Sequence, residues 1–127
     1  METFSGFPNK MRFTPLPDLF FTRLLPHIED TAELKVTLHI LWALYHKRGY
    51  PRFITYRELL GDRILMGGIK RAEALRKALE QATQRGTLLH LTLERDGEQD
   101  EVYLLNTESD RKAIDRIQRG ELLPEQV

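Results

Sequence analysis

The sequence predicts an α+β fold that is mainly α-helical and carries one small β-hairpin. Three observations support this: a helix-capping motif at residues 55–58, an amphipathic periodicity over residues 69–85, and an alternating apolar pattern after residue 88. Apolar residues spaced three and four apart indicate a helix buried on one face, and strict alternation indicates a half-buried strand. The chain has 127 residues, 41% of them hydrophobic and 30% charged, which are the length and composition of one ordinary folded domain.

The first helix of this central region begins at a capping box. The Thr55 hydroxyl is expected to accept from the backbone N–H of Glu58, while the Glu58 side chain reaches back to Thr55. Leu59 and Leu60 then supply an apolar face. The sequence Leu65-Met66-Gly67-Gly68 is expected to break this run as a glycine-containing turn.

A second, longer helix is expected from about Ile69 to Arg85. Its apolar stripe consists of Ile69, Ala72, Leu75, Leu79 and Ala82. Gly86 is expected to end it. Leucines at 89, 91 and 93 then alternate with polar residues, Asp96-Gly97 makes a turn, and residues 102–105 return. A short helix, a turn, an amphipathic helix and a hairpin in this order are typical of a winged helix-turn-helix.

The polar face of the second helix suggests contact with duplex DNA, because the second helix of a helix-turn-helix lies in the major groove. The candidate residues for the groove are Lys70, Arg71, Lys77, Gln81 and Gln84, and the candidates for the DNA backbone are Arg52, Arg57 and Arg85. The alternative is that these side chains form only a solvated helix face. Residues 10–85 carry a net charge of +6 and residues 86–127 a net charge of −5, so the charge pattern supports a nucleic-acid face only in the first two-thirds.

The region before residue 54 is expected to contain an arm, a short helix and a long apolar helix. Residues 1–12 are interpreted as a flexible N-terminal arm, and residues 18–25 as the short helix, closed by Pro26. Asp30 and Glu33 form a second capping box, which opens a helix from about Thr31 to Lys47. The expected stripe of this helix is Leu34, Leu38, Leu41, Trp42 and Tyr45, widened by Val36 and Ile40.

Four apolar residues of this region are candidates for an oligomer interface. They are Phe20, Phe21, Leu38 and Trp42. The more favoured alternative for the adjacent phenylalanines is packing in the core of the same chain. A helix that is apolar on most of its circumference is either central to its fold or buried against a second subunit.

Residues 13–107 are expected to form the domain, and residues 108–127 a last helix and a tail. The helix is expected from about Glu108 to Arg119, with thin apolar content at Ala113, Ile114 and Ile117. That stripe could dock on the domain or begin a linker to a further region. The tail after Leu122 ends without a closing element, so we expect that the natural protein could continue.

No arrangement of residues indicates catalysis, a cofactor or a metal. The four histidines are scattered, no phosphate-cradling motif occurs, and the chain has no cysteine. We therefore expect a non-enzyme without cofactor or metal ligands. The start of the chain lacks the apolar core of a signal peptide, and the longest apolar segment is too short for a membrane span. A cytoplasmic protein that does not enter the membrane is expected.

Several short segments resemble winged-helix replication proteins. Phe13-Thr14-Pro15-Leu16-Pro17, followed by Asp18 to Phe21 and Leu24-Leu25-Pro26, resembles the opening of the N-terminal domains of DnaD-type primosomal proteins and of phage and plasmid replication initiators. Residues 33–41 resemble their next apolar helix, and residues 74–89 the end of their recognition helix. The resemblance covers about residues 13–105. It implies a non-catalytic DNA-binding domain in replication initiation, with double-stranded DNA, a second copy of the chain and other replication proteins as partners.

Two departures from that family favour an alternative. Met66 to Ile69 stand where the family usually has a Ser- or Thr-rich helix start, and the hairpin sequence from Glu94 to Glu101 contains five acids and one arginine. A wing that lies along phosphates should be basic. The alternatives are an oligomerisation scaffold module of such a protein, with little DNA contact of its own, and a winged-helix transcriptional regulator.

Overall fold

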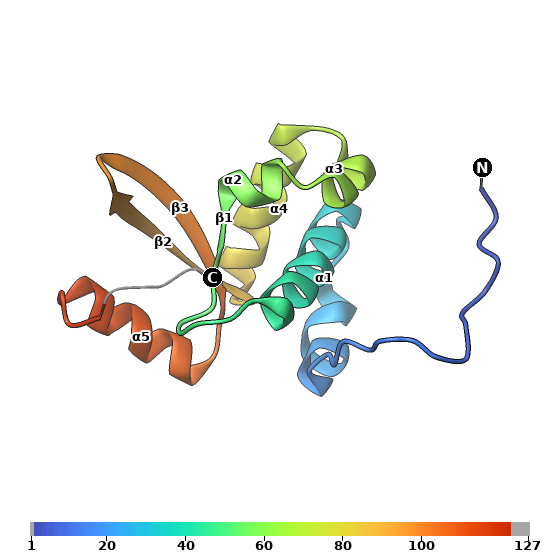
Figure 1. Cartoon of the computed structure of the whole chain (residues 1–127), viewed down its shortest axis with the longest axis horizontal. Helices are drawn as coiled ribbons and strands as arrows, with labels where there is room; N and C mark the ends of the chain where they lie inside the picture. The colour runs from blue at the N-terminus through green and yellow to red at the C-terminus, as the bar shows by residue number, and fades with distance from the viewer. Residues whose placement is uncertain (1, 123–127) are drawn as a thin grey trace.

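A computed structural model describes residues 2–122 (Figure 1). The elements in chain order are a π-helical turn η1 (Phe20–Leu24), a 3-10 turn η2 (Leu25–His27), α1 (Thr31–His46), β1 (Ile54–Thr55), α2 (Tyr56–Leu60), α3 (Arg63–Ile69), α4 (Ala72–Arg85), β2 (Leu88–Arg95), β3 (Glu98–Leu105) and α5 (Glu108–Gln118). The prediction of a mainly helical α+β fold with a small hairpin is confirmed. The expected tail falls largely on residues 123–127, which lie outside the described residues.

The described strands form one antiparallel sheet in the order β1-β3-β2. β2 and β3 pair from Leu88 opposite Leu105 to Arg95 opposite Glu98. Asp96 and Gly97 turn the chain between them with φ of 52° and 79°, which is the two-residue turn that needs positive φ at both positions. β1 places Ile54 opposite Tyr103. The sequence reasoning missed β1, because two residues cannot display an alternating pattern.

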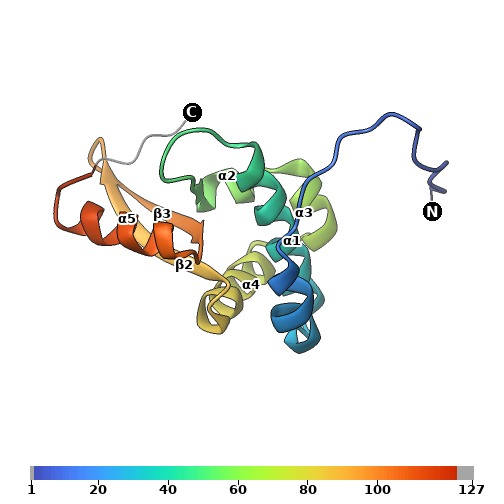
Figure 2. The same ribbon diagram turned by 90° about the horizontal axis from the view of Figure 1, so that it is seen from below.

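The two faces of the sheet are covered differently. Leu88 and Tyr103 pack into the main core with α1 and α4. The opposite face is covered by α5, which runs along the hairpin in both views (Figures 1 and 2). The second apolar cluster there consists of Phe53, Leu89, Leu91, Leu93, Val102, Leu104, Ile114 and Ile117. The last helix therefore docks on the domain. No helix in residues 2–122 has the length and apolarity that crossing a bilayer requires.

The buried face of α1 differs from the stripe expected from the sequence. Val36 and Ile40 are fully buried and Leu44 nearly so, with Leu75 and Leu79 of α4 in the same cluster. Two members of the expected stripe are instead exposed, Trp42 by 45% and Tyr45 by 48%. The expectation is right at Val36, Ile40 and Leu41 and wrong at Trp42 and Tyr45, because a helix that is apolar nearly all round gives no clear signal for which face is buried.

The start of α1 has only one of the two hydrogen bonds of a capping box. The Asp30 carboxylate accepts from the backbone N–H of Glu33 at 3.1 Å, as expected. The Glu33 side chain does not return to Asp30 but lies in the interior, where it receives two hydrogen bonds from Arg85 of α4, at 2.7 and 2.9 Å. The reciprocal half of that predicted capping box is therefore wrong. The box at Thr55 and Glu58 is complete and confirms the prediction.

The expected glycine turn at residues 65–68 is helical. α3 begins after Asp62, whose side chain accepts from the backbone N–H of Leu65 at 3.0 Å, and Leu65 is only 4% exposed. The same carboxylate lies 3.0 Å from Nε2 of His39 in α1. The cap and the burial of Leu65 outweigh the helix-breaking tendency of Gly67 and Gly68. Asp62 thus joins the start of α3 to the middle of α1.

The charge of Asp62 is expected to make part of the stability depend on pH. Burial raises its pKa, but the hydrogen bonds from the Leu65 amide and from His39 outweigh burial and hold the pKa below the ordinary value of 3.8. Because the pKa of Asp62 is lower in the folded than in the unfolded chain, its charge stabilises the fold at pH values above the unfolded pKa. This stabilisation is lost as the pH falls through the folded pKa. Asp62→Asn should therefore lower the free energy of unfolding by about 0.5–1 kcal/mol at neutral pH, with the gap closing in acid. Urea unfolding of the unaltered chain and of Asp62→Asn from neutral to acidic pH tests this prediction. A stability difference that does not change with pH would contradict it.

Candidate nucleic-acid interface

Lys70 and Arg71 form the turn between α3 and α4. Lys70 ends α3 with a φ of 77°, and Arg71 is the N-cap residue of α4 without a capping hydrogen bond from its side chain. Both residues are exposed. The expectation that one helix would begin near Ile69 and carry both on its face is therefore wrong. They lie instead at the N-terminal end of α4, where the partial positive charge of the helix adds to that of the two cations.

The outward face of α4 carries both signs of charge. Lys77 and Gln84 are exposed, as expected for residues that face DNA. Glu73 and Glu80 are exposed on the same face, because they are spaced three and four residues from Lys77. Oε1 of Glu73 also lies 3.6 Å from Nη1 of Arg71. The positive part of this face is therefore confined to its N-terminal half.

Gln81 does not lie on the outward face. It is half-buried, and its side-chain oxygen is buried without a hydrogen-bond partner. Thr37 of α1, the helix that packs against α4, has a buried hydroxyl in the same condition. The assignment of Gln81 as a base-reading residue is corrected by this burial, since a side chain whose acceptor is inside the protein cannot present it to a base edge.

Arg85 is bound to a buried carboxylate. Its Nε and Nη2 donate to Glu33, whose side chain is 1% exposed, while the Arg85 side chain is 27% exposed. The hydrogen bond to Glu33 raises the pKa of Arg85 further, against the opposing effect of burial. Its guanidinium thus neutralises a buried carboxylate, and the expected contact of Arg85 with a DNA backbone stays a prediction.

Arg57 and Arg52 already have partners within the chain. Nη2 of Arg57 lies 2.9 Å from Glu98, and its Nε lies 3.8 Å from Asp100, both in the hairpin. Arg52 donates to the carbonyl oxygens of Leu44 and Tyr45 at 3.5 and 3.3 Å, at the end of α1. The Arg57 pair explains part of the acidic hairpin: those acids face a cation of α2. The prediction that either arginine contacts a DNA backbone stays untested.

The sequence reasoning missed two cations near the α3–α4 turn. Arg63 is the exposed first residue of α3. Arg76 is exposed on α4, and its guanidinium carbon lies 4.1 Å from the centre of the Tyr56 ring. The sequence predicts no helix that includes Arg63, because a turn is expected at residues 65–68. Residues 63–77 contain five Lys and Arg and one acid, a net charge of +4, which is the signal that could have found both.

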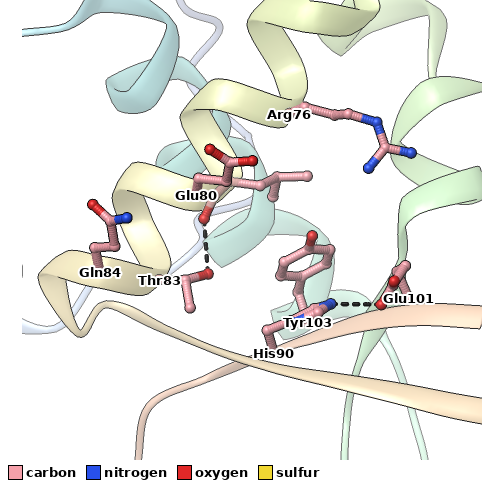
Figure 3. Close-up of a pocket in the computed structure, with 8 residues that line it drawn as sticks. Arg76, Glu80, Thr83, Gln84, His90, Glu101 and Tyr103 are labelled. Carbon is pink, nitrogen blue, oxygen red and sulfur yellow. Dashed lines mark hydrogen bonds and ion pairs between the residues drawn. The ribbon is translucent and has the colours of Figure 1, made fainter.

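A cavity lies beside the basic segment, which we define as residues 63–77, between α4 and the hairpin (Figure 3). Its volume is about 280 Å³, and it is lined by Arg76, Leu79, Glu80, Thr83, Gln84, His90, Glu101 and Tyr103. The Thr92 hydroxyl donates to the Glu101 carboxylate at 2.8 Å, and Nε2 of His90 lies 2.6 Å from the same carboxylate. Both interactions lower the pKa of Glu101, whereas burial raises it. Burial raises the pKa of Tyr103.

The chemistry of this cavity separates it from the basic segment. The Thr83 hydroxyl donates its hydrogen to the carbonyl oxygen of Leu79 in the same helix (Figure 3). That hydrogen is therefore already used within α4. Glu80 and Glu101 bring negative charge to the cavity wall. Arg76 lies on the same wall, so both signs of charge meet there. The cavity therefore marks the edge of the cationic surface toward the hairpin.

The candidate oligomer residues are also divided by the structure. Phe20 is 2% exposed and belongs to the interior of this chain, so its assignment to an accessible interface is corrected. Phe21, whose ring packs edge-on against that of Phe20, is 50% exposed, and Trp42 is 45% exposed. Leu38 is half-buried. Only Phe21 and Trp42 of the four present much apolar surface.

Within residues 2–122 no three His, Asp or Glu side chains gather as a metal site would require. Comparisons with protein-family models, with curated proteins and with solved structures find no match to this chain.

Proposed function

We propose that this chain is a winged-helix domain that binds duplex DNA without catalysing a reaction. The observation that carries the proposal is the connectivity around the basic segment: α1, β1, α2 with α3, α4, and then the β2–β3 hairpin, with β1 paired to β3. This is the order of elements in which a short strand, a helix pair and a hairpin position a recognition helix. In this assignment α4 is the recognition helix and the hairpin is the wing.

The proposed contact surface is the α3–α4 turn and the first half of α4. Its cations are Arg63, Lys70, Arg71 and Lys77. The N-terminus of a 14-residue helix adds unpaired backbone N–H groups and a favourable dipole for phosphate. Gln84 is exposed near the C-terminal end of α4, outside this first half, and lines the cavity with Glu80 and Glu101. The base-reading role expected for it stays a prediction.

The wing takes a different role in this proposal. Glu98 and Asp100 are held by Arg57, and Asp100 also accepts from Arg95 at 2.7 Å. Exposed acids on the hairpin repel a phosphate backbone, so the wing turns away from DNA and braces α2. A role in replication initiation rests on the resemblance of residues 13–105 to DnaD-type and initiator domains; the wing's acidity stays a departure from that family.

A salt titration with matched variants tests the proposal. Fluorescence anisotropy of a labelled duplex should show binding that weakens steeply as salt rises, because phosphate contacts release counterions. The triple variant Lys70→Ala/Arg71→Ala/Lys77→Ala should bind more weakly to all sequences and flatten the salt slope by about 3, roughly 1 for each lost contact.

The control removes the same charge from the opposite part of the domain. Arg111→Ala/Lys112→Ala/Arg116→Ala changes three exposed cations of α5 and leaves the α3–α4 turn intact. It should keep nearly the full slope and affinity. Equal losses in the two variants would assign binding to net charge alone, and an absence of salt-dependent binding in the unaltered chain would refute DNA binding.

A further inference from the structure

The N-terminal arm extends away from the domain and exposes its aromatic side chains. Phe4, Phe7 and Phe13 are 68%, 77% and 76% exposed, and Met11 is 43% exposed. Both views show this segment leading outward from η1 (Figures 1 and 2). The rings of Phe4 and Phe7 pack edge-on, with their centroids 4.9 Å apart. Four large apolar side chains within ten residues form a segment that gains free energy by entering an apolar site.

Prolines direct the arm outward. Thr14-Pro15-Leu16-Pro17 connects it to η1. Proline fixes its own φ and restricts the preceding residue to an extended conformation, so all four residues favour a straight path. The arm therefore leaves its own domain in a fixed direction, and it is better placed to contact another molecule than to fold back.

Two adjoining cavities lie where the arm joins the domain. The larger has a volume of about 440 Å³, and η1 with the residues just before it lines the cavity with four apolar side chains and one cation: Pro17, Leu19, Phe20, Arg23 and Leu24. The smaller has a volume of about 240 Å³. The two share Pro17, Leu41 and Leu105 as a common apolar ridge. Together they form what we call the root groove, lined mainly by apolar side chains.

We propose that two copies of this chain associate by exchanging arms, each placing Phe4, Phe7 and Phe13 in the root groove of the other. The area is sufficient for a stable contact: six phenylalanines that each bury about 150 Å² contribute roughly 900 Å². The groove walls contribute a comparable area, so the total of roughly 1,800 Å² lies in the range of specific interfaces, about 1,200–2,000 Å². This association uses no residue of the proposed DNA surface and does not rest on DNA binding.

Sedimentation of the whole chain over a wide concentration range gives the first test. The unaltered chain should be a dimer, and Phe4→Ser/Phe7→Ser/Phe13→Ser should weaken dimerisation by more than about a hundredfold, because a few buried aromatics carry most of an interface. These residues are exposed, so the variant should retain the unfolding midpoint of the unaltered chain at concentrations where both are monomeric. A chain that is monomeric throughout, or a triple variant that dimerises equally well, would overturn the proposal.

The absence of cysteine permits a direct test of where the arm lies. Phe7→Cys combined with Arg23→Cys places thiols on the arm and on the wall of the larger cavity. Oxidation should yield covalently linked dimers, whereas Phe7→Cys with Lys112→Cys, on the exposed side of α5, should not. A disulfide formed within one chain would show that the arm folds back on its own domain, and a lack of any linkage would place it elsewhere; either result would overturn the exchange.

Discussion

Replacing Arg85 by alanine is expected to lower the free energy of unfolding by about 3 kcal/mol, at the lower end of the range for a broken buried ion pair. The reason is the carboxylate that remains: the Glu33 side chain is 1% exposed and receives both of its close hydrogen bonds from Arg85. Without the guanidinium it is a buried charge with no partner. Arg85 itself is 27% exposed, so water can partly replace it, which keeps the loss below the upper limit.

The matched control removes both charges. Glu33→Met/Arg85→Met replaces the pair by apolar side chains of similar length and should stay within about 1 kcal/mol of the unaltered chain, because the desolvation of both ions is removed with their attraction. Urea unfolding of the single and double variants measures both values. A single variant as stable as the double one would mean that Glu33 finds another partner or that water reaches it.

Leu75→Ala should have a comparable effect for a different reason. Leu75 is fully buried between α4 and the rest of the main core, with Leu79 beside it on the helix. Removing its side chain loses the transfer free energy of three carbons and leaves a cavity, which together lower the free energy of unfolding by about 2–5 kcal/mol. Denaturant unfolding checks this value.

Ile64→Ala is the matching control on the surface. Ile64 is 78% exposed on α3, so its truncation should change the free energy of unfolding by less than about 0.5 kcal/mol. Similar losses at both positions would mean that Ile64 is covered, for instance by another molecule.

Local chemistry was enough to predict most element ends. Side chains that cap their own helix, such as Asp30 and Thr55, act over three residues, so the sequence displays them directly. The same holds for Gly86, which ends α4 with a φ of 90°, and for the Asp96-Gly97 turn. Alternation predicted that Leu91 and Leu93 would be buried, and they are.

Tertiary contacts decided what the sequence could not show. Glu33 matches the pattern of a reciprocal cap, yet its partner is Arg85, 52 residues away. Gly67 and Gly68 are helical because a cap and a buried leucine support the helix around them. Among the candidate DNA residues, helical spacing from Lys77 predicts that Gln81 lies on the outward face, and Arg85 is a candidate for the DNA backbone. The burial of the Gln81 oxygen and the pairing of Arg85 with Glu33 depend on how α1 packs on α4, which no local pattern specifies.

The backbone conformation at Lys70 favours glycine, whereas the proposed DNA contact favours a cation at the same position. A lysine with a φ of 77° holds a strained backbone, whereas glycine reaches such angles freely. A screen of all amino acids at this position for heat resistance should therefore enrich glycine, while a screen for the proposed DNA binding should enrich lysine and arginine. Evolving this domain for heat resistance alone would tend to erase its cationic turn, so thermostable variants of it need to be chosen with position 70 held fixed.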